Sequence, residues 1–417
     1  MRRRAAWLLG ILMLASLLSG CRGEPSLEDS SVSSRPSANA SSAAGTTTAA
    51  TVSGTATGTT TVSAPESALP PQTLERTVTP EIAAVYGRTG RKNDCLLLEW
   101  SGSGFAVRVT GSAVEIRLRA AVKEGEQPPY IRIWVDGEER EYRPVSGSVS
   151  LRFRLGEGEH LIRLIRLSEP LTVAPVEVIS LRLEGDDHMP PALLEPPVPS
   201  SRRIEFIGDS LTCGFGITGR PYAVTGEPGR FLTGEEDVTK TYAGVTAAYF
   251  QADARYTAAS GTGVCNNHPD TATELRIPQL FALASPAAET KWDPSLWQPQ
   301  VVVINAGTND YRGNTTPDEL HTGVMALLEK VRRAYPEAAI IWMYGMMNDK
   351  LEESLVKGIQ DYNAAWGDRV YYFPVESIDG VEEQGALGHP NAAAHKERAE
   401  PLIRLISRLT GWDEAKD

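Results

Sequence analysis

The chain is poor in cysteine, has no histidines in a metal-ligand spacing and carries no surplus of basic residues. Four cysteines in 417 residues exclude a small disulfide-stapled scaffold. Neither Cys-x-x-Cys nor His-Glu-x-x-His occurs, so the sequence offers no recognisable zinc site. Acidic residues outnumber basic ones by 53 to 41, and the net charge of −12 repels the phosphate backbone of nucleic acids. We therefore expect no metal ion, no cofactor and no nucleic-acid partner.

The apolar stretch at the start of the chain, Ala5 to Leu18, is shorter than the ~20 residues that a membrane-spanning helix needs. Three arginines precede it and small residues follow it, so residues 1–21 have the layout of a secretory signal. An uncleaved anchor is the alternative. The end of the segment, Leu18-Ser19-Gly20-Cys21, resembles a bacterial lipobox, which implies that Cys21 becomes lipidated. We expect an exported lipoprotein, anchored through Cys21 to the outer face of the cell membrane.

Two composition changes mark the next segments. Residues 22–75 are rich in Ser, Thr, Ala and Gly and have few large apolar side chains, which predicts a disordered linker. Residues 76–185 have an apolar period of two, as at 114–118, and turn sequences such as Asp136-Gly137 bound the short runs. This pattern predicts an all-β sandwich of the jelly-roll type. Its alternating arginines indicate a solvated sheet face, and sugar binding by that face is the alternative.

Residues 186–201 carry five prolines and no period, which predicts a stiff connector. From 202 to 417, strand patterns alternate with helix patterns. We predict strands at 204–207, 254–259, 301–305, 340–343 and 370–373, and helices at 242–250, after the capping residue Thr316 and after Asn391. Pro401 should bend or restart the last helix. The alternation predicts a three-layer α/β domain with a parallel sheet, whose reactive groups lie at the carboxyl ends of the strands.

Four short polar motifs occupy these strand ends and the entry to the last helix. Gly208-Asp209-Ser210-Leu211 follows the first strand, where a serine in a turn can expose its hydroxyl and aim its N–H at an oxyanion. Ser260-Gly261-Thr262-Gly263 follows the second strand, and glycine lets the backbone approach a substrate closely. Gly307-Thr308-Asn309-Asp310 follows the third, and His389 precedes the last helix. Each motif alone could be an ordinary turn, but their shared placement predicts a catalytic site.

The four motifs, in this order, resemble the sequence blocks of the SGNH (GDSL) hydrolases over residues 202–410. Gly-Asp-Ser-Leu-Thr-Cys-Gly-Phe-Gly and the Trp297-Gln-Pro that precedes the third strand look closer still to carbohydrate esterase family 2. The resemblance implies a flavodoxin-like catalytic domain behind an N-terminal jelly roll. Family 2 members are similar to acetylxylan esterases and remove O-acetyl groups from plant polysaccharides. An acetylated polysaccharide is therefore the substrate that the resemblance implies.

The same resemblance implies roles for individual residues. Ser210 would be the nucleophile, and His389 would be the general base that later protonates the leaving sugar hydroxyl. The oxyanion hole would consist of the N–H of Ser210, the N–H of Gly261 and the side-chain amide of Asn309.

The chain departs from the family pattern at one position of the catalytic triad. The family usually has an aspartate two or three residues before the histidine, and Leu387 and Ala386 stand at those positions here. Either a backbone carbonyl orients His389, which gives a Ser-His dyad, or a nearby carboxylate folds back to it. The candidate carboxylates are Glu382, Glu383 and Asp379. We prefer the dyad.

Other residue pairs have competing interpretations. Asp209 and Asp310 could form a glycosidase-like carboxylate pair, but local capping is the better interpretation. Cys213 and Cys265 each follow a strand-end motif, so an exported protein could join them in a disulfide, and two free thiols are the alternative. Trp292 and Trp297 could stack on a sugar or pack structurally.

Together these observations predict a serine esterase that deacetylates carbohydrate such as acetylated xylan or glucomannan. Within enzymes, the alternative is a peptidoglycan or exopolysaccharide O-acetylesterase, because a tether would keep the active site near the cell envelope. The alternative from another class is a carbohydrate-binding lipoprotein whose catalytic site has decayed.

Overall fold

The computed structural model describes residues 72–413, except 227–228, 272 and 368. These residues belong to one compact unit of the chain, Ser67–Asp417. The predicted signal sequence, the lipidation site Cys21 and the linker as far as residue 71 lie outside the described residues. Within the part of the chain that is described, no helix combines the length and the apolar character that crossing a bilayer requires.

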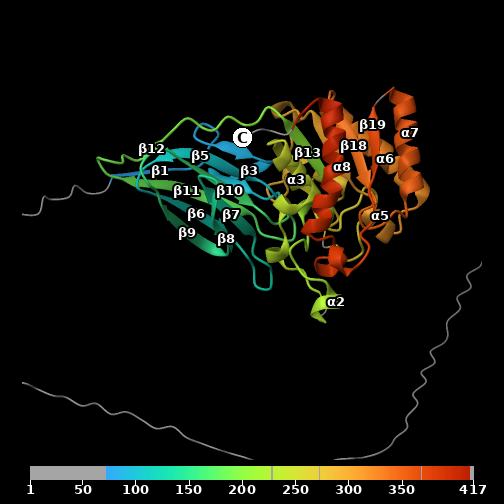
Figure 1. Ribbon diagram of the computed structural model, residues 1–417, viewed down its shortest axis with the longest axis horizontal. Helices are drawn as coiled ribbons and strands as arrows, with labels where there is room; N and C mark the ends of the chain where they lie inside the picture. The colour runs from blue at the N-terminus through green and yellow to red at the C-terminus, as the bar shows by residue number, and fades with distance from the viewer. Residues whose placement is uncertain (1–71, 227–228, 272, 368, 414–417) are drawn as a thin grey trace, which may run out of the picture. The chain divides into compact units, whose positions relative to one another are not determined.

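The first part of the described chain is a β-sandwich of two antiparallel sheets (Figure 1). One sheet has the order β3-β4-β11-β6-β9, with β1 paired to β11, and the other has the order β12-β5-β10-β7-β8, with β2 paired to β5. The strands are β1 (Gln72–Arg76), β2 (Ala84–Tyr86), β3 (Thr89–Lys92), β4 (Cys95–Leu98), β5 (Gly104–Thr110), β6 (Ala113–Ala120), β7 (Tyr130–Val135), β8 (Glu138–Pro144), β9 (Gly147–Arg154), β10 (His160–Arg166), β11 (Val176–Gly185) and β12 (Ala192–Leu193). Ile116 of one sheet and Ile133 of the other share a buried core. The predicted all-β domain is confirmed.

Alternation along β6 explains why the charged residues lie outside. Ile116 is fully buried, while its neighbour Arg117 lies on the outer face and pairs with Glu75 at 3.1 Å. Arg119, two residues further, pairs with Glu177 of β11. These two arginines are therefore held in ion pairs with acidic neighbours on the solvated face of the sheet.

The second part is an α/β domain around a parallel sheet with the order β14-β13-β17-β18-β19. Its elements are β13 (Arg203–Gly208), α1 (Ser210–Cys213), α2 (Tyr222–Thr225), η1 (Thr233–Glu235), η2 (Val238–Lys240), α3 (Tyr242–Tyr249), β14 (Asp253–Ala258), α4 (Ile277–Leu280), β15 (Leu283–Ser285), β16 (Thr290–Lys291), η3 (Pro294–Leu296), β17 (Val301–Asn305), α5 (Thr308–Arg312), α6 (Pro317–Ala334), β18 (Ala339–Tyr344), α7 (Glu352–Trp366), β19 (Val370–Pro374), η4 (Val381–Glu383), η5 (Ala386–Gly388) and α8 (Ala392–Thr410).

Helices cover both faces of this sheet, so its strands are apolar on both sides (Figure 1). Along β17, Val301 and Val303 pack with α3 and α8, whereas Val302 and Ile304 pack with α6 and α7. The sequence therefore shows a continuous apolar run at this strand and no alternation. The predicted three-layer α/β domain is confirmed.

Four elements illustrate where the structure differs from the sequence prediction. Strand β1 begins at Gln72, inside the segment predicted as linker, because it adds to the edge of β11. Strand β12 lies within the predicted connector, where it pairs with β5. Helix α7 was not predicted. Helix α8 continues through Pro401 without restarting; the residue four positions earlier, Glu397, is exposed, so water can replace the missing backbone hydrogen bond.

A buried arginine joins the sandwich to the α/β domain. Arg88, between β2 and β3, is 1% exposed and donates to the carboxylate of Glu205 on β13. It also donates to the carbonyl of Phe281 at 2.6 Å. Because both charges of the pair are buried, removal of Arg88 leaves Glu205 with the hydroxyls of Tyr335 and Thr257 but without the guanidinium that donates to it.

We expect Arg88→Leu to lower the free energy of unfolding by about 3–5 kcal/mol, since the Glu205 carboxylate then stays buried without the guanidinium that pairs with it. Urea unfolding followed by tryptophan fluorescence measures the loss. The matched control is Arg117→Leu, which breaks an exposed ion pair of the same type and should leave the unfolding midpoint almost unchanged. Equal midpoints for the two variants would contradict a structural role of the buried pair.

Candidate active site

Three of the four polar motifs meet at one edge of the parallel sheet. Strand β13 lies between β14 and β17, and its last residue, Gly208, pairs with Ala258 on one side and Asn305 on the other. The segments that follow these three strands therefore begin side by side at the carboxyl edge, as the sequence analysis expected.

Ser210 is the first residue of the short helix α1. Asp209 caps this helix by accepting the N–H of Leu211 at 3.0 Å, and Gly214 ends it in the left-handed conformation. Position 208 requires glycine, because a Cβ there would lie only 2.4 Å from Thr212 Oγ1. The turn thus holds Ser210, 5% exposed, at the end of β13.

His389 approaches Ser210 from the loop that precedes α8. Its Nε2 lies 2.9 Å from Ser210 Oγ, which is hydrogen-bond distance. The other ring nitrogen, Nδ1, lies 3.3 Å from the carbonyl oxygen of Leu387 and can donate to it. The ring of Phe215 packs against the imidazole, with 4.6 Å between ring centroids. The histidine is therefore held by a backbone carbonyl and an aromatic ring.

One of the candidate acids, Glu383, is held by other groups. Glu383 pairs with Arg398 and accepts the N–H of Asp379 at 2.7 Å. Among the described residues, the hydrogen bonds of the His389 side chain go to Ser210 and Leu387 and to no carboxylate. This geometry favours the dyad.

The proposed oxyanion donors lie on the two neighbouring strand ends. Gly261 has a φ of 76°, and a Cβ there would lie 1.7 Å from Thr271 Oγ1, so only glycine fits this turn. The amide nitrogen of Asn309 donates to Asp209 at 3.0 Å and to the carbonyl of Thr262 at 2.9 Å. Asn309 thus ties the serine turn to the glycine turn, and it must exchange one of these two bonds before it can donate to an oxyanion.

Comparisons with known proteins agree with this geometry. Residues 206–397 match the GDSL-like Lipase/Acylhydrolase family, and residues 85–192 match the Carbohydrate esterase 2 N-terminal family. An acetylxylan esterase / glucomannan deacetylase of Cellvibrio japonicus is 32% identical over 274 residues, which are 62% of this chain and 71% of that protein. The chain belongs to carbohydrate esterase family 2.

Other family 2 relatives support the assignment. The cellulase/esterase CelE of Acetivibrio thermocellus is 30% identical over 322 residues, which cover 75% of this chain but 38% of the length of CelE. A family two carbohydrate esterase from Clostridium thermocellum, solved in complex with cellohexaose, has a TM-score of 0.70 at 28% identity and covers 79% of this chain and 99% of its own. The acetyl xylan esterase Est2A from Butyrivibrio proteoclasticus has a TM-score of 0.72 at 24% identity, covers 82% of this chain and 100% of its own, and shares the fold.

The pKa of His389 in this family 2 chain determines the pH range in which the histidine can act as a base. Burial lowers the pKa of His389 to about 4, and backbone hydrogen bonds offset only part of that effect. The imidazole is therefore neutral, and able to accept a proton, at any pH well above 4. A nearby carboxylate would favour the charged form and raise this pKa.

We expect the acid limb of kcat/KM to lie below pH 6.5, the pKa of an ordinary imidazole. A pH series on an activated acetyl ester measures it. In Leu387→Asp, a carboxylate two residues before His389 should move the limb upward; position 387 has a φ of 54°, which aspartate tolerates better than leucine. A wild-type limb at or above pH 6.5 would show that His389 has an acidic partner.

The disulfide considered between Cys213 and Cys265 is absent, and both residues are free thiols. Cys213 Sγ lies 3.4 Å from a carboxylate oxygen of Glu169, on the side of the sandwich. Cys265 Sγ instead lies 3.2 Å from the carbonyl oxygen of Glu319 in α6. The two side chains follow neighbouring strand ends but turn toward different elements, so the alternative of two thiols describes the structure.

The remaining candidates are structural in this family 2 chain. Asp310 accepts the N–H groups of the segment 264–266 at 2.7 to 3.2 Å, so its role is to brace the loop after β14. Trp297 is 4% exposed and donates to Asp253, while Trp292 donates to the Tyr335 hydroxyl at 2.9 Å. Both indole N–H groups are therefore engaged within the protein.

Two residues near the site were missed by the sequence analysis. Phe215 stands in the Gly-Phe-Gly sequence just after the serine motif, so its position offered a signal. Glu169 comes from the sandwich and accepts the N–H of Ser260 at 2.5 Å. No pattern marked it, because a single acid in a loop has no period and no motif.

Proposed function

We propose that this chain is a serine esterase that removes O-acetyl groups from polysaccharides. The contact of 2.9 Å between Ser210 Oγ and His389 Nε2, at the strand edge that also presents the Gly261 turn, carries the proposal. An intact contact between nucleophile and base argues against a decayed site with a binding role only. The substrate class is supported by the relatives, which include an acetylxylan esterase / glucomannan deacetylase.

The proposed reaction proceeds in two halves. His389 Nε2 takes the proton of Ser210 Oγ as this oxygen attacks the acetyl carbonyl carbon, and the N–H groups of Ser210 and Gly261 stabilise the resulting oxyanion. When the intermediate collapses, the bond from the carbonyl carbon to the sugar oxygen breaks, and His389 returns the proton to that oxygen. Water, activated by His389 in the same way, then releases acetate from the acetylated Ser210.

Acetate release tests this proposal. The full-length protein is incubated with acetylated xylan, acetylated glucomannan, O-acetylated peptidoglycan and an acetylated exopolysaccharide, with Ser210→Ala as the matched control. Release from xylan or glucomannan that is absent in the control supports the proposal. Release from peptidoglycan or exopolysaccharide alone would replace this substrate class with an envelope polymer. No release from any polymer would overturn the carbohydrate assignment.

We further propose that the chain is exported and anchored to the cell membrane through Cys21. Support comes from residues 1–21 alone, because these residues lie outside the described structure. Cys21→Ala should abolish lipidation and release the protein from the membrane fraction. Fractionation of the producing cells, with immunodetection of the protein, measures the change. A variant processed and membrane-bound like the wild type would contradict the lipid anchor.

A further inference from the structure

An acidic side chain of the sandwich reaches the catalytic edge of the α/β domain. Glu169 lies in the loop between β10 and β11 and is 2% exposed. One oxygen of its carboxylate, Oε2, accepts the N–H of Ser260 at 2.5 Å, and the other, Oε1, accepts from the Thr172 hydroxyl at 3.0 Å. Ser260 immediately precedes Gly261, whose N–H is the proposed oxyanion donor. Glu169 therefore holds the backbone one residue away from that donor.

A second buried acid lies next to Glu169. Glu236, between η1 and η2, is 0% exposed; its Oε2 accepts the N–H of Glu169 at 3.1 Å, and its Oε1 has no hydrogen-bond partner. The thiol of Cys213, on the helix that Ser210 begins, donates to Glu169 Oε2 at 3.4 Å. One ligand-type atom from each of the three groups lies within 4.8 Å of the other two.

The only cation that faces this cluster among the described residues is Arg166, and it does not bond to either carboxylate. Its guanidinium donates to backbone carbonyls of the loop and of β4, at Ser168, Glu169, Val173, Ala174 and Leu98. Arg166 also interacts electrostatically with a third buried acid, Glu99. One shared cation cannot compensate all of these carboxylates.

Two carboxylates this close in a buried site do not both ionise at neutral pH, so they titrate as a pair. Burial raises the pKa of Glu169, and burial together with the charge of Glu169 raises the pKa of Glu236 well above its usual range. Glu169 receives three donors, from Ser260, Thr172 and Cys213, which suit the ionised form. Glu236 accepts only one hydrogen bond, so the proton is more stable on Glu236 than on Glu169.

We propose that Glu169 and Glu236 share one proton and that the ionised Glu169 positions the Ser260–Gly261 turn for oxyanion stabilisation. Glu169 is then a positioning residue, and the sandwich domain supplies part of the catalytic apparatus. The inference rests on the proposed esterase function for its kinetic readout.

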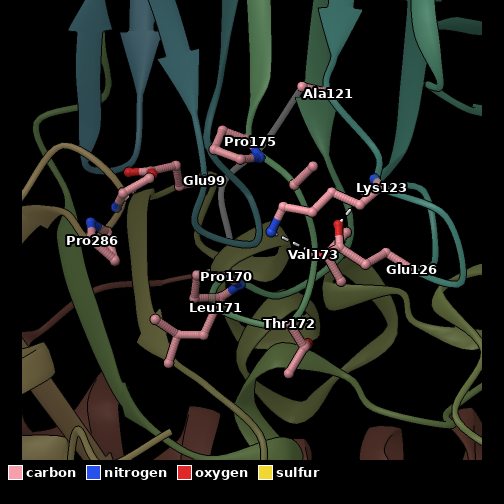
Figure 2. A pocket seen from close by; sticks show the side chains of 12 residues that line it. Glu99, Ala121, Lys123, Glu126, Pro170, Leu171, Thr172, Val173, Pro175 and Pro286 are labelled. Atoms are coloured by element: carbon pink, nitrogen blue, oxygen red, sulfur yellow. Dashed lines mark hydrogen bonds and ion pairs between the residues drawn. The ribbon is translucent and has the colours of Figure 1, made fainter. Parts of the chain in front are cut away.

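The packing around Glu169 explains why its hydrogen bonds matter. Pro170, Leu171 and Thr172, which directly follow it, line a cavity of about 330 Å³ that Glu99 and Lys123 also line (Figure 2). The loop therefore has open space on that side. Its position against Ser260 depends on the bonds of Glu169 and on the bonds of Arg166 to the loop carbonyls.

Kinetics of four variants test the proposal, with an activated acetyl ester as substrate and the full chain as enzyme. Glu169→Ala leaves the Ser260 N–H without an acceptor, so kcat should fall at least about tenfold while KM stays nearly constant. Glu169→Gln keeps a carbonyl acceptor and should restore most of kcat. The matched control is Glu99→Gln, an equally buried acid that accepts from Ala287 and not from the catalytic turn; its kcat at neutral pH should stay close to that of the wild type.

The pH profile separates positioning from a merely structural role. At alkaline pH the shared proton leaves, the two carboxylates repel each other, and kcat of the wild type should decline. Glu236→Gln removes the second titrating group, so this alkaline decline should be absent from that variant. Infrared difference spectra supply a readout without turnover, because the carbonyl band of protonated carboxylic acids at pH 7 should be weaker in Glu236→Gln than in the wild type.

Three results would overturn the proposal. The first is a folded Glu169→Ala variant with unchanged kcat. The second is an identical infrared band and an identical alkaline decline in the wild type and Glu236→Gln, which decides the matter even if Glu169→Ala does not fold. The third is a stoichiometric divalent metal ion in the purified protein that is lost in Cys213→Ser, because the three groups would then be metal ligands. A wild type that forms the infrared band but hydrolyses no ester would instead count against the proposed function.

Discussion

Replacement of Ser210 or His389 by alanine is expected to lower kcat/KM for an acetyl ester by at least about 10⁴-fold, and the double variant should be hardly worse than either single one. The two side chains act as one unit, because the proton that leaves Ser210 Oγ must pass to His389 Nε2, 2.9 Å away. Purified variants are compared with wild type on an activated ester. Thermal unfolding of each variant confirms that the fold is retained.

The same assay decides whether the histidine has an acidic partner. If Leu387 alone orients His389, then Glu382→Gln, Glu383→Gln and Asp379→Asn should each cost far less than the ~10⁴-fold that loss of an orienting aspartate costs in a full triad. Glu397→Gln is the matched control for Glu383→Gln, since both acids pair with the same arginine. A drop of several hundred-fold in one of the three variants would identify a relocated acid and reject the dyad.

Replacement of Asn309 by alanine is expected to lower kcat by about 10²–10³-fold, with KM nearly unchanged. The amide would act on the oxyanion, which exists in the transition state and not in the bound substrate. In the structure both amide N–H groups are engaged, with Asp209 and with the carbonyl of Thr262. Binding of the transition state must therefore replace one of these two bonds.

A matched control distinguishes a catalytic role of the Asn309 amide from a role in holding the turn in place. Asn266→Ala removes an amide that donates to Thr315 at 2.9 Å in the neighbouring loop, and its kcat should stay close to that of wild type. A fall of less than tenfold in Asn309→Ala would show that the amide keeps its structural bonds during turnover. The oxyanion hole would then consist of backbone N–H groups alone.

Most of the fold could be predicted from local patterns in the sequence. The apolar run at 301–305 predicted a strand covered on both faces, and β17 is buried at every residue. Thr316 and Glu319 predicted a capping box, and both of its hydrogen bonds are present at the start of α6. Helix α7 carried the same kind of signal in Leu355, Ile359 and Tyr362, which recur at helical spacing and face the core. This helix was therefore predictable from the sequence.

Pairing between distant segments is marked less clearly in the sequence than local structure is. Strand β12 has two residues in a proline-rich segment, so neither length nor alternation marked it, and only the open edge of β5 makes it a strand. That Cys213 and Cys265 turn toward different elements could not be predicted from the sequence either, because spacing after a strand end does not fix the direction in which a side chain turns.

The sequence by itself determined the order of strands and helices, the parallel sheet and the edge at which Ser210, Gly261 and Asn309 stand. These features follow from hydrophobic periodicity, capping residues and the common direction of parallel strands, all of which act over a few neighbouring residues. The tertiary structure alone decided which distant groups meet, as Glu169 of the sandwich does with Ser260, 91 residues away. Such contacts depend on how two domains pack, and a single buried polar group that is satisfied across a domain boundary leaves no repeating pattern in the chain.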